Sequence, residues 1–122
     1  MPALVAANVT ITIPVAYARR IDDSGRRRVF GTLAFGDGAL TYPTGGIPMP
    51  AIGNFDMRVV MQQLNIIGNN ATTNEYVPMW NKTTNKLVLY DEEVVAAGGP
   101  LLEALSSEAP TARLYDFEAV GW

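Results

Sequence analysis

The 122-residue sequence contains neither cysteine nor histidine. Without cysteine there is no disulfide, no thiolate metal site and no cysteine nucleophile. Without histidine the commonest general base and the commonest zinc ligand are missing. An enzyme built from this chain would depend on carboxylates, serine, lysine or tyrosine. The two absences therefore favour a protein that is not an enzyme and needs no cofactor.

Long apolar runs are also missing. No stretch is long and apolar enough to span a membrane, and residues 1–9 lack the basic start, apolar centre and cleavage site of a signal peptide. We therefore expect a protein made in a cytoplasm, with no membrane partner. The length suits one domain that buries a core without disulfides.

Charge is unevenly distributed along the chain, whose formal net charge is −3. Acidic residues concentrate towards the end of the sequence, while five of the nine basic residues surround one expected turn. Like charges at a hairpin tip repel each other, so we expect these arginines to meet an acidic surface of another chain in an assembly. On this basis Arg27→Glu should weaken association.

Alternation of apolar and polar residues indicates β-strands. It is sharpest from Val9 to Tyr17, and it returns over residues 29–35 after a turn at residues 22–25. We predict a hairpin of residues 9–20 with residues 26–35. Pro14 has no N–H to donate, which places its strand at a sheet edge or at a bulge.

The middle of the chain carries turn signals and one ambiguous segment. Gly36, Asp37 and Gly38 predict a tight turn into a short second strand, and residues 42–46 predict a following bend. Residues 54–67 fit both strand and helix periodicities. The β-rich context favours a strand, with a bulge near Gln62 and Gln63, where the apolar parity changes.

Further elements complete an all-β chain. We predict a hairpin of residues 76–80 with 86–91, a covering loop over 92–110 and a last strand over 112–120. The fold class is an antiparallel β-sandwich or small β-barrel of about seven strands with little helix. Residues 9–122 would form this single domain. Residues 1–8 show no periodicity, which is typical of a flexible or interface arm.

No residue is assigned to catalysis, to a cofactor or to a metal. The candidates for an interface are instead apolar residues of the arm, of the glycine- and proline-rich bend and of the C-terminal end, together with the clustered arginines. They are Leu4, Val5, Arg19, Arg20, Arg26, Arg27, Arg28, Ile47, Met49, Ile52 and Trp122.

Four stretches, residues 31–36, 42–48, 76–90 and 117–122, follow one another in an order that resembles a known family. The chain is similar to small structural proteins encoded in the head genes of tailed bacteriophages, of the capsid decoration or cement type. The likeness is one of turn and strand patterns, and it extends from about Val29 to the end.

The resemblance implies a non-enzymatic protein on the capsid surface of the virion. Its partner would be the phage major capsid protein, it would form a homo-oligomer, commonly a trimer, and it would help the shell resist internal DNA pressure. It would contact neither nucleic acid nor membrane. Under this hypothesis deletion of residues 1–7 should reduce capsid occupancy without unfolding the domain.

Three other functions fit parts of the sequence. Asp116 and Glu118 share a strand face and would suit a two-carboxylate glycosidase, although such a pair is more often solvated surface. The arginines would suit a nucleic-acid reader, but the net charge is acidic and no aromatic residues are interleaved with them. The closest alternative is a tail tube, tail-tip or fibre module of the same virus, because one fold serves many roles.

Overall fold

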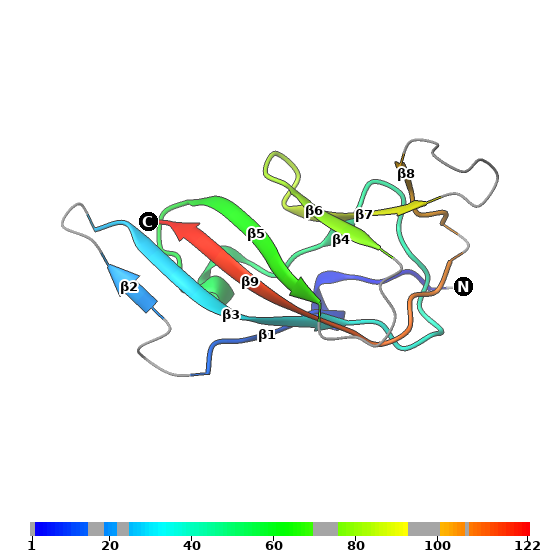
Figure 1. Ribbon diagram of the computed structural model, residues 1–122, viewed down its shortest axis with the longest axis horizontal. Helices are drawn as coiled ribbons and strands as arrows, with labels where there is room; N and C mark the ends of the chain where they lie inside the picture. The colour runs from blue at the N-terminus through cyan, green and yellow to red at the C-terminus, as the bar shows by residue number, and fades with distance from the viewer. Residues whose placement is uncertain (1, 15–18, 22–24, 70–75, 93–100, 107) are drawn as a thin grey trace.

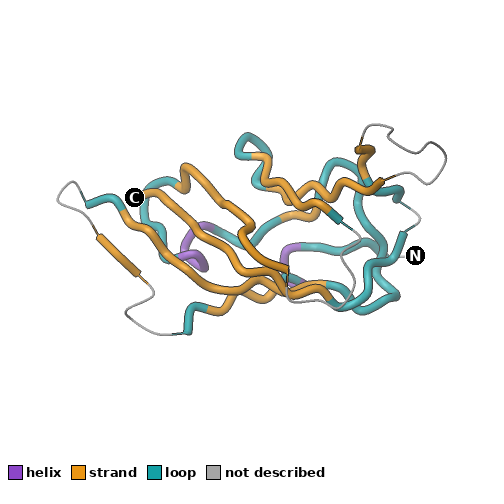
Figure 2. Tube along the Cα trace, in the orientation of Figure 1, coloured by secondary structure: helices purple, strands orange, loops and turns teal. Residues whose placement is uncertain are grey.

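The structure is a computed structural model, and it describes residues 2–14, 19–21, 25–69, 76–92, 101–106 and 108–122. Within these residues the chain forms nine strands, and its only helical elements are 3-10 turns. The strands make two antiparallel sheets, of five and four strands, on either side of a shared core (Figures 1 and 2). The predicted all-β fold with little helix is confirmed.

The first sheet has the order β1-β3-β9-β5, with β2 paired to β3 on the same side as β1. β1 and β2 pair with the two ends of β3, which confirms the predicted pairing and the edge position of the first strand. The prediction of one strand over residues 9–20 is wrong at Ile13 and Pro14, which follow β1, and a proline there has no N–H to continue the ladder. Residues 15–18, which connect β1 to β2, lie outside the described residues. The strand bounds are β1 Thr10–Thr12, β2 Arg19–Ile21, β3 Arg27–Phe35, β5 Met61–Asn69 and β9 Arg113–Gly121.

The second sheet has the order β4-β7-β6, and β8 also pairs with β7. The predicted hairpin of residues 76–91 is confirmed by the pairing of β6 with β7. The covering loop predicted over 92–110 is wrong at residues 101–103, which form β8; residues 93–100 lie outside the described part. The strand bounds are β4 Ile47–Pro48, β6 Val77–Asn81, β7 Lys86–Glu92 and β8 Leu101–Glu103.

The ambiguous segment divides into two parts. A 3-10 turn, η3 (Ile52–Phe55), is followed by Asp56 in the left-handed conformation at φ 62°, and β5 begins only at Met61. The strand prediction is correct from Met61 and wrong for residues 54–60, because a left-handed residue ends any regular element there. The expected bulge is confirmed by a register shift between Met61 and Gln63.

The chain does not form the hairpin expected at residues 36–38. Gly36 and Gly38 do adopt positive φ values, of 96° and 79°. The chain then turns away from β3, because the Gly38 N–H donates to the Pro110 carbonyl at 3.0 Å. The following bend does form, and it is closed by a 3.1 Å hydrogen bond from the Gly46 N–H to the Pro43 carbonyl.

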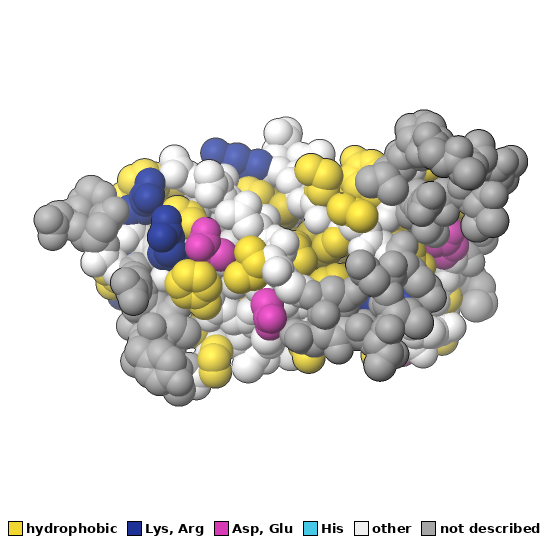
Figure 3. Space-filling model, in the orientation of Figure 1, with side chains coloured by type: hydrophobic (Ala, Val, Ile, Leu, Met, Phe, Trp, Pro, Cys, Tyr) yellow, Lys and Arg dark blue, Asp and Glu magenta, His cyan; other side chains and the backbone are white. Residues whose placement is uncertain are grey.

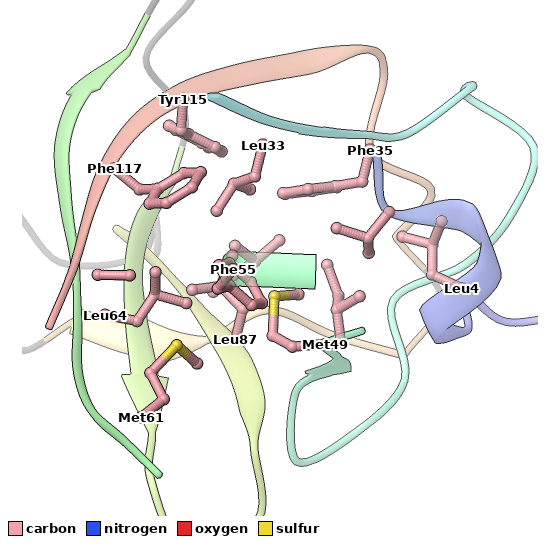
Figure 4. Close-up of a cluster of buried hydrophobic side chains, with 14 of the residues drawn as sticks. Leu4, Leu33, Phe35, Met49, Phe55, Met61, Leu64, Leu87, Tyr115 and Phe117 are labelled. Carbon is pink, nitrogen blue, oxygen red and sulfur yellow. The ribbon is translucent and has the colours of Figure 1, made fainter. Parts of the chain in front are cut away.

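Residues 2–8 pack against the rest of the chain and do not form a free arm. The Leu4 N–H donates to the Thr41 carbonyl at 2.9 Å, and the Thr41 N–H donates to the Pro2 carbonyl at 3.0 Å. The Leu4 side chain is only 1% exposed and lies on the Phe35 side of the core (Figure 4). Burial of this apolar side chain opposes the entropy of a loose end.

One hydrophobic core joins the two sheets (Figure 4). Two aromatic contacts organise it: Phe117 meets Phe55 edge to face at 5.4 Å between ring centroids, and Tyr115 lies 5.8 Å from Phe35. The central members are Val29, Leu33 and Phe35 from β3, Tyr115, Phe117 and Ala119 from β9, Met61 and Leu64 from β5, and Ile47, Leu87 and Leu89 from the second sheet.

A partly buried polar contact fixes β8 to the bend at residues 43–46. The Glu103 carboxylate accepts hydrogen bonds from the Tyr42 hydroxyl at 2.7 Å and from the Gly45 N–H at 2.6 Å. Burial is the main cause that raises the pKa of Tyr42 above its ordinary value, and the hydrogen bond to Glu103 adds to it. The hydroxyl therefore stays protonated and continues to donate.

Replacing Phe117 by alanine should destabilise the protein by about 3–5 kcal/mol, because the ring is fully buried and a cavity would remain. Leu114→Ala is the matched control. Leu114 lies on the same strand but on the opposite face, where it is exposed, and the change should cost less than about 1 kcal/mol. Urea denaturation measures both values, and equal losses would contradict the assignment of the two faces.

Candidate protein interface

Consecutive arginines at the start of β3 point to different sides of the sheet. Strand alternation turns Arg27 inward with Val29, whereas Arg28 points outward with Phe30. β2 lies alongside, with the backbone of Arg20 opposite that of Arg28. The side chains of Arg19 and Arg20 lie outside the described atoms.

Arg27 is a structural residue. Its side chain is 9% exposed, and its guanidinium lies 3.2 Å from the Asp56 carboxylate and donates to the Asp56 carbonyl over the same distance. This pair ties the start of β3 to the turn after η3. The expected role of Arg27 at an interface is therefore corrected: Arg27→Glu would disturb folding as well as any association.

Arg28 belongs to an exposed group of side chains on the outer face of the first sheet. The cross-strand register places Phe30, Glu118 and Asn65 in one row across β3, β9 and β5. The Arg28 Nε lies 3.8 Å from a Glu118 carboxylate oxygen, and the Asn65 amide lies 3.5 Å from the other. We call Arg28, Phe30, Asn65 and Glu118 the outer patch.

The outer patch combines charge with an exposed aromatic ring. Positive, acidic and hydrophobic side chains lie next to one another over this sheet (Figure 3). Phe30 is 36% exposed, and Leu114, further along β9, is 40% exposed on the same face. Arginine and aromatic residues are enriched at the energetic centres of protein interfaces.

Several of the predicted interface residues lie inside the molecule. Leu4, Ile47 and Met49 are core residues, and each is at most 5% exposed. Their side chains are not available to a partner. Ile52 is half-buried and packs against the same core. The residues left at the surface are Val5 and Arg28, which are exposed, and Arg26 and Trp122, which are half-buried.

A second exposed apolar surface, on β6, was not predicted from the sequence. Val77 and Met79 are 46% and 59% exposed on one face of that strand. They stand opposite Tyr90 and Val88 of β7. The period-two spacing of Val77 and Met79 was the available signal, but alternation alone does not say which face of a strand meets the core.

The outer edge of β6 is poorly suited to pair with another strand. The Leu89 carbonyl accepts from the Ala104 N–H at 2.8 Å, and the Leu89 N–H points to the Tyr42 hydroxyl at 3.4 Å, so both groups face away from β6. Pro78 is the cross-strand partner of Leu89, so the main-chain groups of Pro78 must point away from β7, to the free edge of the sheet. Because proline has no N–H, this edge lacks a donor that strand addition requires.

A pocket of about 240 Å³ opens between β5 and β6. No charged side chain lines it, and the hydroxyl of Tyr76, one of its two tyrosines, donates to Glu108 at 3.2 Å. The Arg113 guanidinium stacks on the Tyr76 ring at 5.4 Å and supports it from within. The lining residues are Ile66, Ile67, Gly68, Tyr76, Val77, Pro78 and Tyr115.

The two carboxylates considered for catalysis lie on an open sheet. Asp116 and Glu118 stand on the outer face of β9, and neither lines the pocket between β5 and β6.

Among the described residues there is no group of three potential metal-ligating side chains. In the same part of the chain, no helix has the length and apolarity needed to cross a membrane.

Comparisons of the chain with protein-family models, with curated proteins and with solved structures gave no match. The outer patch and the resemblance found in the sequence are therefore the two observations that bear on function.

Separate substitutions of Arg27 and Arg28 distinguish the roles of the two side chains. Arg27→Gln should lower the free energy of unfolding by about 1–3 kcal/mol, because it leaves the Asp56 carboxylate without its buried partner. Arg28→Gln removes only an exposed pair and should cost about 0–1 kcal/mol. Urea titration checks the order, and a larger loss for Arg28 than for Arg27 would reverse the assignment.

Proposed function

We propose that this protein is a non-enzymatic structural protein of a tailed-phage virion, a capsid decoration or cement protein that binds the outer capsid lattice and stabilises the head. The observation that carries the proposal is the outer patch, in which Arg28 and Phe30 are exposed beside Glu118. The family resemblance of the sequence supplies the virion context, with the major capsid protein as the partner.

The outer patch is held on a rigid support. β3 pairs with β9 over its whole length, and β5 pairs with the other side of β9. Side chains fixed by a sheet lose little conformational freedom when a partner binds, which favours affinity. A preorganised surface of this kind suits a contact with an ordered protein lattice.

The charges favour a protein partner over nucleic acid. Arg27 is occupied by Asp56, Arg28 lies beside Glu118, and the chain carries a net charge of −3. A phosphate backbone would meet carboxylates within the same patch, whereas an interface of mixed charge can satisfy both signs.

Several copies of the outer patch in one oligomer would strengthen binding beyond that of a single weak contact. A homo-oligomer, with a trimer favoured by the resemblance, would present several copies of the outer patch to equivalent sites on a symmetric shell. Linked contacts of this kind give an avidity well above the affinity of one contact.

Purified protein should bind expanded phage heads and raise the temperature at which they rupture. Arg28→Glu should weaken binding about tenfold, equivalent to about 1.4 kcal/mol, and increasing salt should weaken binding of the parent protein. Lys82→Glu is the matched control, because it makes the same charge change on the exposed β6–β7 turn. Sedimentation of heads with labelled protein measures the bound fraction.

Two results of the same sedimentation experiment would contradict the proposal. Labelled protein that decorates only tails would replace the cement function by the tail-module alternative. Equal losses for Arg28→Glu and Lys82→Glu would remove the outer patch from the interface. Deletion of residues 1–7 is no longer a clean test, since it removes Leu4 from the core; Val5→Ser probes the exposed part of that segment instead.

A further inference from the structure

Three consecutive main-chain N–H groups converge on one oxygen next to the start of β5. The N–H groups of Arg58, Val59 and Val60 donate to the main-chain oxygen of Trp122 over 2.9, 2.6 and 3.0 Å. The Trp122 N–H donates in return to the Val60 carbonyl at 2.9 Å. We call the three converging N–H groups the amide ring.

The amide ring offers more donors than a neutral acceptor needs. An amide carbonyl oxygen has two lone pairs, whereas three N–H groups point at this oxygen. Successive main-chain N–H groups that face a common point form a concavity that binds anions, and carboxylate ends of peptides are captured in this way. The donor set therefore matches a carboxylate better than an amide.

Nearby charges favour an anion as well. Arg58 contributes both an amide of the ring and an exposed guanidinium, and Arg26 and Arg28 lie on the adjacent hairpin. Asp56, which precedes Arg58 by two residues, is paired with Arg27. The C-terminal end lies at the same end of the molecule as the β2–β3 hairpin (Figure 1). A positive local potential stabilises a negative oxygen at this position.

Close main-chain approach gives the site its selectivity. A Cβ atom at Gly121 would overlap the Val60 carbonyl oxygen, so glycine is required before the residue held by the ring. The Val59 side chain is 76% exposed and contributes little packing. Recognition therefore comes from the backbone of residues 58–60.

We propose that the amide ring is a binding site for a peptide carboxylate preceded by glycine, and that the main-chain oxygen of Trp122 occupies this site in the structure. Occupation orders residues 58–60. These residues directly follow Asp56 and Met57, so the site also supports the Arg27–Asp56 pair and the core contact of Met57. The inference is independent of the proposed virion function.

Binding to a chain shortened by Gly121 and Trp122 tests the site directly, because the glycine of the probe must take the place of Gly121 against Val60. The probe is N-acetyl-glycyl-tryptophan, and its C-terminal amide is the matched control. Calorimetry should show the carboxylate peptide binding at least about tenfold more tightly than the amide, because a charged acceptor forms stronger hydrogen bonds. Equal affinities, or no binding of either peptide to a folded chain, would overturn the proposal.

Two changes in the 122-residue chain keep the test decisive if the shortened chain does not fold. Val59→Pro removes the N–H of the shortest hydrogen bond and should lower Tm by about 3 °C or more, whereas Val59→Ala should leave Tm unchanged. A Gly-Ser extension after Trp122 converts any carboxylate into an amide and should also lower Tm. An unchanged Tm for the extended chain contradicts an anionic occupant.

Discussion

The register of β9 against its two neighbours is the constraint on which the rest of the structure depends. β9 pairs with β3 from Arg113 opposite Phe35 to Gly121 opposite Arg27, and β5 occupies its other side. Since strand side chains alternate, this register sends Phe117 inward and Glu118 outward. A shift by one residue would exchange the core with the surface. The hydrophobic core and the outer patch are thus two faces of one pairing.

Several contacts far apart in the sequence hold that register in place. The Arg27–Asp56 pair joins the start of β3 to the turn before β5, and the amide ring holds the residue that follows β9 against the same turn. The partners of β9 come from residues 27–35 and 61–69, so the first sheet is completed only when the last strand has entered it. Pairing over such separations makes folding slow compared with local hairpin formation.

The same architecture determines which kind of interaction the surface supports. Pro78 weakens the free edge of β6 as a site for strand addition, while the outer face of the first sheet presents Arg28 and Phe30 on fully paired strands. At β6, binding through side chains is therefore favoured over strand addition. The proposed docking on a capsid lattice would use the outer face of the first sheet and would require no exchange of strands.

The sequence by itself determined the local elements, because the direction of a side chain along a strand repeats every two residues. That period fixed the all-β class, the hairpin of residues 76–91, the last strand, and the bulge between Met61 and Gln63. Proline and glycine likewise indicated the edge position of the first strand, which ends before Pro14, and the positive φ at Gly36.

Only the tertiary structure decided which faces and ends are buried. Strand alternation puts Arg27 and Arg28 on opposite faces, but only the tertiary structure decided that the Arg27 face is buried and that Asp56 pairs with this arginine. Leu4 entered the core through its pairing with Thr41, and residues 36–38 turned towards Pro110 instead of back along β3. Local periodicity carries no information about partners distant in the chain, and those partners determine what is buried.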